Sequence, residues 1–229
     1  MILQILAEDF TPHMSKTISL NTTNTEYNVS LAPGKSVEGV LLGVEGKPAA
    51  GVTIYLLGPM EQGYLNNKGE IHAYQVGDES QCTTDAEGKF KFAAKLGEAE
   101  VFAATKEGFA RASAKELPPK IELQRYGKVR GRLVKDGKPM AEQEVDLGWE
   151  RDFRAERPHV GMHGTLTDEE GRFEISMVPA GKLKVTRRDK SGLGGGWSNV
   201  EIKKFEGRAG EVVELGDLEY PESQFSRAR

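Results

Sequence analysis

Two histidines with the spacing of metal ligands are the first candidates for chemistry. His159 and His163 stand four residues apart, a spacing that places two side chains on one face of a helix and lets them share a zinc ion. Pro158, Gly161 and Gly164 break any such helix, and no glutamate follows His159 as a zinc-protease motif requires. We therefore expect a solvated pair of loop histidines and predict no metal site.

Two short acidic segments are the second candidates. Calcium prefers closely spaced oxygen ligands, which residues 85–88 (DAEG) and 168–171 (DEEG) supply, but neither segment has the alternating acidic positions and distal glutamate of a calcium loop. In Thr-Asp-x-x-Gly the Asp or Thr oxygen can instead accept hydrogen bonds from turn amides, while glycine adopts the left-handed backbone. We predict structural turns built by Thr84, Asp85 and Gly88, and by Thr167, Asp168 and Gly171.

The remaining nucleophile and phosphate-binding patterns are incomplete. Residues 191–197 (SGLGGGW) lack the Lys-Ser/Thr and the helix start of a phosphate-binding loop, so we expect a hairpin loop. The sequence places no base near Cys82, so we expect a small, partly buried core residue. No serine stands in a Gly-x-Ser-x-Gly elbow. We predict no catalytic residue and no cofactor, and hence a protein that is not an enzyme.

Five aromatic residues outside the repeated core pattern described below are the ligand-binding candidates. Exposed aromatic rings stack on the apolar faces of sugars, so Trp149, Trp197, Tyr64 and Tyr74, together with Phe153, are candidates for binding a glycan. The alternative, which we favour from the sequence, is that these rings anchor loops against a sandwich or pack between units.

An internal repeat positions all these residues. Residues 37–56 and 129–147 share Val-x-Gly, Gly-Lys-Pro and alternating apolar residues, and a Thr-Asp-x-x-Gly-x-Phe pattern follows each. From Gly-Lys-Pro onwards the first segments align at an offset of 91 residues and the later ones at 83, so the second copy lacks eight residues between them. Insertions concentrate in loops, so the difference marks a connection between strands. The shared turn residues are Gly46 and Pro48 in one copy and Gly137 and Pro139 in the other.

Alternating hydrophobicity predicts strands throughout the repeat. Val52, Ile54 and Leu56 occupy alternate positions, and Phe90 and Phe92 alternate with lysines. Short strands at ~8–12-residue spacing, with turn signals between them, are typical of β-sandwiches. We predict an all-β fold with two complete tandem sandwich units.

Composition and the N-terminal segment bound the remaining possibilities. The chain has 31 Lys and Arg against 35 Asp and Glu, without the clustered basic face of a nucleic-acid-binding protein. No run approaches the ~18 apolar residues of a membrane-spanning helix, and residues 1–10 lack the features of a secretory signal. Residues 1–34 look like the closing strands of a further unit, or else form an extension that adds an edge strand. The chain is cytoplasmic if Met1 is the true start, and extracytoplasmic if it belongs to a longer exported protein.

The repeated pattern resembles the carboxypeptidase regulatory-like domain family, a transthyretin-like or Ig-like Greek-key β-sandwich. The resemblance covers residues 35–220 and rests on the Val-x-Gly, Gly-Lys-Pro and Thr-Asp-x-x-Gly-x-Phe motifs, while Gln143 and a Gly-rich insertion depart from the pattern. It implies an accessory module beside catalytic, membrane or surface domains, usually outside the cytoplasm, with kinship to carbohydrate-binding folds.

Together these observations predict four segments: a partial strand region (1–34), two sandwich units (35–124 and 125–220) and a flexible tail (221–229). We predict a non-catalytic module that spaces or presents other domains of a larger bacterial, envelope-associated protein. Its partners would be those neighbouring domains or envelope components, with no nucleic acid. Two alternatives stay open: a carbohydrate- or protein-binding module that uses the loop aromatics, and a fragment of an enzyme whose catalytic domain is absent.

Overall fold

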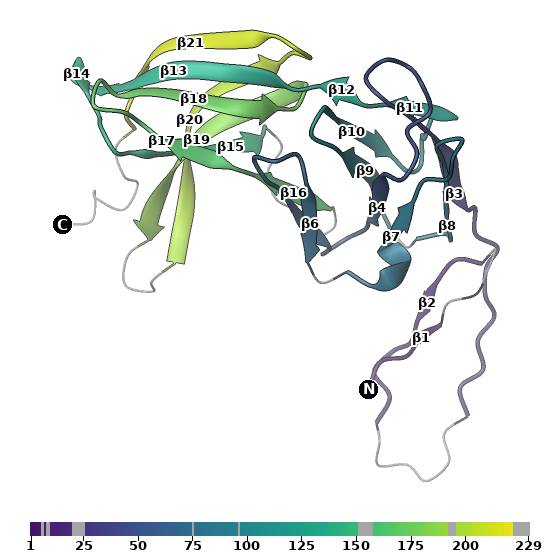
Figure 1. Cartoon of the computed structure of the whole chain (residues 1–229). Helices are drawn as coiled ribbons and strands as arrows, with labels where there is room; N and C mark the ends of the chain where they lie inside the picture. Colours follow the sequence, from purple (N-terminus) through teal and green to yellow (C-terminus); the bar gives the residue numbers. More distant parts are fainter. Residues whose placement is uncertain are drawn as a thin grey trace.

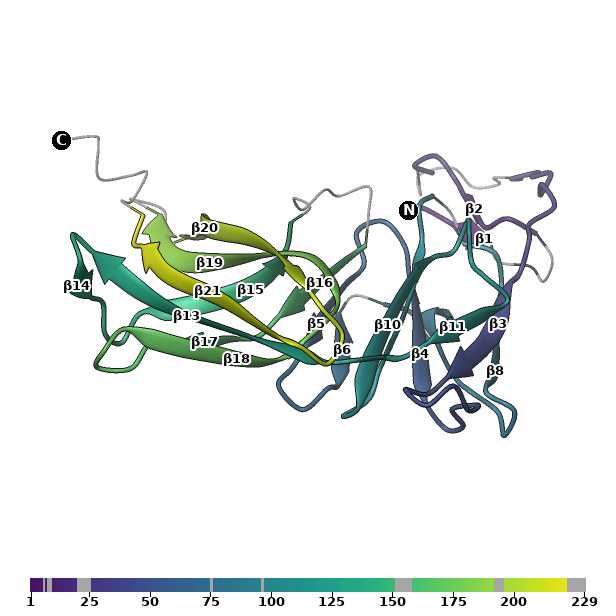
Figure 2. The same ribbon diagram turned by 90° about the horizontal axis from the view of Figure 1, so that it is seen from above.

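The computed structural model describes residues 1–5, 7, 10–19, 26–74, 76–95, 97–150, 158–191 and 196–221. Within these residues the chain forms twenty-one strands and one 3-10 helix, η1 (Asp78–Ser80), which confirms the all-β prediction. The strands build two β-sandwiches that lie side by side, with a small sheet shared between them and a hairpin at the N-terminus (Figure 1). Figure 2 shows the same arrangement from above.

The first sandwich consists of a three-stranded sheet, β11-β3-β8, and a five-stranded sheet, β12-β10-β9-β4-β7. Phe90 and Phe92 are buried while the lysines between them are exposed, so the predicted alternation points one face of β8 into the core. Leu41 and Ile121 from the smaller sheet belong to the same core cluster as Ile54 from the larger sheet. The strands are β3 (Val37–Leu42), β4 (Thr53–Leu57), β7 (Gln81–Thr83), β8 (Lys89–Phe92), β9 (Glu100–Ala104), β10 (Gly108–Ser113), β11 (Lys120–Glu122) and β12 (Gln124–Arg125).

The second sandwich repeats this topology. Strand β13 takes the place of β3, since it pairs antiparallel with β18 and parallel with the last strand, β21, as β3 does with β8 and β11. The facing sheet is β17-β15-β19-β20. The duplicated sequence is therefore a duplicated strand order. The strands are β13 (Gly127–Lys135), β14 (Lys138–Pro139), β15 (Glu144–Trp149), β17 (Gly164–Leu166), β18 (Arg172–Val178), β19 (Gly181–Ser191), β20 (Gly196–Gly207) and β21 (Val212–Glu219).

A third sheet joins the two halves. Strand β16 (His159–Met162) from the second half pairs in parallel with β5 (Gln62–Leu65) from the first, and β5 pairs antiparallel with β6 (Ile71–Tyr74). These strands come from equivalent connections, between β4 and β7 in the first half and between β15 and β17 in the second. The eight-residue difference between the repeats falls in this connection, which forms strands where the sequence suggested a loop.

The hydrophobic core is continuous across this junction. Leu57, Phe102 and Phe109, from β4, β9 and β10, belong to one buried cluster with Trp149 and Leu183 of the second half. The opposite face of the same five-stranded sheet covers the core of the first sandwich. This sheet is buried on both faces, so the two sandwiches pack as one body.

The N-terminal segment forms its own small hairpin. Strands β1 (Gln4–Ile5) and β2 (His13–Met14) pair with each other, and they pair with no other strand of the described residues. A bridge between Phe10 and Pro33 holds the hairpin to the chain that leads into β3. Residues 6, 8, 9 and 20–25, within the predicted segment 1–34, lie outside the description.

The threonines of the repeated turns make matching hydrogen bonds in the two halves. Thr84 Oγ1 accepts a hydrogen bond from Val52 N (2.9 Å) and donates one to Ala49 O (2.7 Å). Thr167 makes the equivalent pair, at 2.9 and 2.6 Å. Both side chains are 4% exposed, so each hydroxyl satisfies backbone groups that would otherwise be buried without partners.

The aspartates and glycines of these turns also match. Oδ1 of Asp85 and of Asp168 accepts two turn amides, at 3.0 and 2.7 Å in each case. Gly88 and Gly171 have φ of +75° and +74°. The Gly-Lys-Pro turns are alike too: Gly46 and Gly137 have φ of +73°, Pro48 bridges to Leu42, and Pro139 lies in the short strand β14.

Replacing Gly171 with alanine tests how closely this turn packs against the backbone of Leu133. A Cβ there would lie 2.5 Å from Leu133 O, in a left-handed backbone, so Gly171→Ala is expected to cost about 1–3 kcal/mol of the free energy of unfolding. Gly137→Ala is the matched control, since it has the same φ and no atom within 4 Å, and should cost only about 1 kcal/mol. Guanidinium unfolding measures both, and equal losses would contradict the close approach.

The ion pairs of Glu174 make the free energy of unfolding of the second sandwich decrease at low pH. Hydrogen bonds from Lys128 (2.9 Å) and Arg130 (2.6 Å) lower the pKa of Glu174 from 4.5 to about 2. Because the folded pKa is depressed, this contribution to stability is present above about pH 4.5 and is lost as the pH falls towards 2. We expect Glu174→Gln to flatten the pH dependence of the unfolding free energy in that window. Glu107→Gln, at an exposed turn, is the control and should leave the curve unchanged.

Candidate functional site

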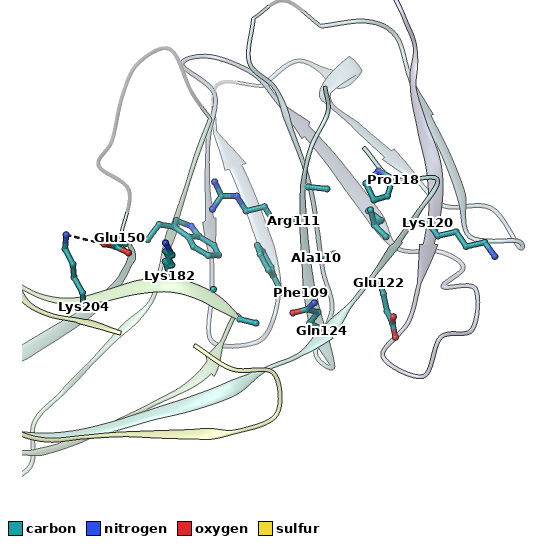
Figure 3. A pocket seen from close by; sticks show the side chains of 15 residues that line it. Phe109, Ala110, Arg111, Pro118, Lys120, Glu122, Gln124, Glu150, Lys182 and Lys204 are labelled. Atoms are coloured by element: carbon teal, nitrogen blue, oxygen red, sulfur yellow. Dashed lines mark ion pairs between the residues drawn. The ribbon is translucent and has the colours of Figure 1, made fainter. Parts of the chain in front are cut away.

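A cleft of about 850 Å³ lies where the two halves meet, and it is the first place to look for a site. Strand β10 and the chain leading to β12 form one wall, and the ends of β15, β19 and β20 form the other (Figure 3). The side chains that matter for its chemistry are Arg111, Glu122, Trp149, Glu150, Lys182 and Lys204.

Arg111 in this cleft is fully engaged by the protein. Its guanidinium forms two hydrogen bonds with the Glu100 carboxylate, at 2.8 and 2.9 Å, across strands β9 and β10. Its carbon Cζ also lies 4.6 Å from the ring centroid of Trp149 and 5.8 Å from that of Phe102. Such a bidentate, stacked arginine holds the wall of the cleft together and has little capacity left for a ligand.

Trp149 is a packing residue between the halves. It is only 9% exposed, its ring centroid lies 5.9 Å from that of Phe109, and its Nε1 donates a hydrogen bond to Val160 O at 2.9 Å. A ring in contact with Phe109 and Arg111 has no face free to stack on a sugar. The structure thus places Trp149 in the alternative role that the sequence left open and corrects its assignment as a ligand-binding residue.

The rest of the cleft carries charges of both signs. Lys204 Nζ lies 3.4 Å from a carboxylate oxygen of Glu150, and Lys182, Lys120 and Glu122 border the same opening. Among the described residues there is no group of three or more His, Cys, Asp or Glu side chains that could hold a metal ion. The cleft therefore has no arrangement of acid, base and nucleophile that we can assign to a reaction.

The exposed face of the shared sheet gathers two of the predicted aromatics. Tyr64 on β5 is paired with His72 on β6, and Tyr74 is paired with Gln62, so all four side chains point to the same side of the sheet. Tyr74 is 52% exposed and Tyr64 is half-buried. Burial raises the pKa of Tyr64, and the nearby carboxylate of Asp146 raises it further. Tyr64 therefore keeps its phenolic proton at neutral pH.

The structure does not place the other two aromatic candidates, Phe153 and Trp197, on this face. Phe153 lies outside the described residues. Trp197 belongs to β20, where its backbone is paired with Lys190, and nothing is described of its side chain. The predicted Gly-rich hairpin loop lies mostly outside the described residues, at 192–195, and the flanking strands β19 and β20 pair antiparallel, with Ser191 opposite Gly196.

The histidine pair differs from the sequence-based expectation. His163 is buried, at 8% exposure, with its Nε2 2.8 Å from Ser176 O, whereas we expected a solvated loop residue. His159 lies on β16 beside Tyr64 and Gly161. A buried side chain bound to a backbone carbonyl anchors the chain between β16 and β17 and is not part of a metal pair.

Cys82 is a half-buried residue packed against the core of the first sandwich, as expected. Burial raises the pKa of its thiol, which keeps the sulfur protonated and a poor nucleophile at neutral pH.

One polar cluster was not anticipated from the sequence. Lys95 Nζ lies 2.5 Å from Glu61 Oε2, 2.5 Å from Ser80 Oγ and 2.8 Å from Leu56 O. A serine beside a lysine is a known catalytic pairing, but Ser80 is 0% exposed and cannot meet a substrate. The cluster instead fixes η1 against β4. Its interacting members lie 15 to 39 residues apart in segments with no shared motif, so only the folded chain brings them together.

No protein-family model matches the chain, and no curated protein matches it. Solved structures with some likeness include the minor pilin GBS52 of Streptococcus agalactiae, at 13% identity and a TM-score of 0.35, covering 81% of this chain and 97% of that one. A streptococcal ancillary pilin has 11% identity and a TM-score of 0.35, covering 96% and 74%. A 9R-lipoxygenase from Cyanothece PCC8801 has 22% identity and a TM-score of 0.28, and the match spans 42% of this chain but only 16% of that enzyme. At these TM-scores the matches carry no argument about function.

Within the described part of the chain, no helix has the length and hydrophobicity needed to cross a membrane.

Proposed function

We propose that this chain is a non-catalytic β-sandwich module that spaces or presents other domains of a larger, envelope-associated protein. The observation that carries the proposal is the junction between the halves. The shared sheet β16-β5-β6 and the continuous core around Phe109 and Trp149 turn two sandwiches into one rigid unit. A rigid unit keeps a fixed distance between whatever is attached at its ends, which is what a spacer requires.

The positions of the chain ends agree with this role. In both views β3, which follows the N-terminal hairpin, lies at the outer side of the first sandwich, and β21 ends at the far side of the second (Figures 1 and 2). Segments joined before β3 and after β21 would thus be held apart by the length of both sandwiches. The resemblance to carboxypeptidase regulatory-like domains supports an accessory role of this kind, because such modules stand beside other domains.

Rigidity is tested by measuring a distance distribution between spin labels at the tips of the two halves. We would label Glu45→Cys and Lys138→Cys, two exposed turn positions, in a Cys82→Ala background. A single narrow distribution is expected, as narrow as that of a control pair within the first sandwich, Glu45→Cys with Lys115→Cys. A broad distribution for the first pair alone would overturn the rigid spacer.

Fractionation of cells that produce the chain from its own gene tests the envelope location.

A glycan-binding role is the second candidate, favoured by Tyr64 and Tyr74 lying on one exposed sheet face. Tyrosine offers an apolar ring and a polar hydroxyl, both of which suit a sugar. Isothermal calorimetry against a glycan panel should show binding, and Tyr64→Ala and Tyr74→Ala should abolish it. Tyr27→Ala is the control: it replaces an exposed tyrosine of the N-terminal segment and should leave binding intact. Flat titrations of the unaltered protein across the panel would remove this candidate.

A further inference from the structure

In both sandwiches the first strand lies beside a strand from the C-terminal part of the same unit and runs in the same direction: β3 beside β11, which β12 follows, and β13 beside β21. Strand β11 is paired in parallel with β3, with Lys120 opposite Val40 and Glu122 opposite Leu42. Strand β21 is paired in parallel with β13, from Lys128 opposite Val212 to Val134 opposite Glu219. Both β11 and β21 are edge strands, and no other strand of the described residues hydrogen-bonds to them. We call these two pairings clamp one (β3·β11) and clamp two (β13·β21).

Parallel pairing decides how each clamp responds to a pull on the chain ends. Tension on the N-terminal side pulls β3 backwards along its axis, while tension on the C-terminal side pulls β11 forwards along the same axis. The two strands must therefore slide past each other, so that all the hydrogen bonds between them are loaded at once. An antiparallel hairpin pulled at its two open ends loses its hydrogen bonds one after another instead.

The two clamps lie in series along the path of the force. Only a short segment, which includes β12, separates the end of β11 at Glu122 from the start of β13 at Gly127. Tension that enters at β3 crosses clamp one, continues along β11 and β12 into β13, and crosses clamp two before it leaves through β21. The hairpins and connections of both sandwiches are bypassed.

From this geometry we propose that the chain is a tension-bearing element, in which each sandwich is closed against force by its own shear clamp. The proposal deepens the spacer function proposed above and rests on it, because a load reaches the clamps only when other segments pull on both ends.

Clamp two is the stronger of the pair. Its strands are in register over six residue pairs, against three in clamp one. Ion pairs also cross it, from Arg130 to Glu214 (3.6 Å) and from Arg132 to Asp217 (3.4 Å). The ends of the two clamps are closed alike: Tyr220 N donates a hydrogen bond to Val134 O at 2.6 Å, and Leu123 N donates one to Leu42 O at 2.9 Å. Clamp one therefore yields first and protects the second sandwich.

Single-molecule force spectroscopy on the full chain tests the proposal. Pulled between its N- and C-termini, the Cys82→Ala protein should show two rupture events in a fixed order, each releasing about 300 Å of chain at ~3.3–3.6 Å per residue. The comparison geometry attaches one handle at Lys138→Cys and the other at the C-terminus. Lys138 is paired with Lys135, at the same end of the sheet as the end of β21, so this geometry unzips clamp two. Rupture of the second sandwich should then occur at a severalfold lower force.

Side-chain variants identify the clamp. Removing the ion pairs across clamp two with Glu214→Ala and Asp217→Ala should lower the force of the second event and leave the first unchanged. Glu174→Ala is the matched control, because Glu174 pairs with the same Arg130 from β18, on the side of β13 that the shear does not load. It should change neither force.

Equal rupture forces in the two pulling geometries, or extension at low force without distinct events, would overturn the proposal. Neither outcome touches the spacer function, which is judged by the label distances in the absence of force. Forced unfolding reports the unfolding rate and not the equilibrium free energy, so a stable and rigid protein that ruptures easily is a distinguishable result. A broad distance distribution with strong, direction-dependent rupture would reject the rigid spacer alone.

Discussion

Replacing Trp149 with alanine is expected to lower the free energy of unfolding by about 3–5 kcal/mol, the range for removing a large aromatic side chain from a packed core. The ring fills the junction between the halves, against Phe109 and beneath Arg111, and its Nε1 hydrogen bonds to Val160 on β16. Two contacts between the halves, with Phe109 and Arg111, and the hydrogen bond to β16 within the second half are lost in one substitution. Guanidinium unfolding followed by far-UV circular dichroism measures the change.

The same variant should loosen the two halves relative to each other. In Trp149→Ala the distance distribution between labels at positions 45 and 138 should broaden, while the control pair within the first sandwich stays narrow. Trp149→Phe separates packing from hydrogen bonding: it retains a ring against Phe109 and leaves Val160 O without its donor, at a cost of about 1–3 kcal/mol. A loss below about 1 kcal/mol for Trp149→Ala would mean that this residue does not join the halves.

Replacing Lys95 with methionine is expected to cost on the order of 3 kcal/mol, because it leaves a largely buried carboxylate without its counter-ion. The Glu61 side chain is 15% exposed and already accepts hydrogen bonds from Gly58 N (2.6 Å) and Ser80 Oγ (2.9 Å), so it cannot turn away to water without breaking them. The methylene stem of methionine fills the space of the lysine, and the loss is therefore one of charge and hydrogen bonding.

A double-mutant cycle shows whether this loss belongs to the pair. Glu61→Gln removes the charge and keeps an acceptor for Ser80, so Lys95→Met with Glu61→Gln should be less destabilising than the sum of the two single variants. Chemical denaturation of all four proteins gives the coupling free energy. Strictly additive losses would mean that the ion pair between Lys95 and Glu61 contributes no coupling free energy to stability.

Local patterns in the sequence determined the strands and turns of each repeat. The Asp-x-x-Gly part of these turns depends on side chains that bond to amides two to four residues away, such as Asp85 to Glu87 and Lys89. The alternation of Phe90 and Phe92 with lysines likewise requires only that one face of a strand meets a core. These are short-range constraints, and both copies of the repeat obey them.

The tertiary structure alone decided which strands are neighbours across the two halves. A period-two pattern states that a strand has a buried face, and it does not state which strand lies beside it. The pairing of β5 with β16, ninety-seven positions further along the chain at each register pair, therefore has no local signature. The same holds for the burial of Trp149 against Phe109 and for the Lys95–Glu61–Ser80 cluster.

The candidate sites divide in the same way. The sequence limited attention to a few aromatics, because no motif in it assembles a nucleophile, a base or a metal-ligand set. Whether an aromatic ring is available to a ligand depends on what covers it, and that is a property of packing between segments distant in sequence. Trp149 became part of a core and Tyr74 remained at the surface, although each is the last residue of a short strand. The sequence by itself thus determined two repeated β-units, whereas only the tertiary structure decided that they form one body whose parallel terminal strands lie in the path of a pull.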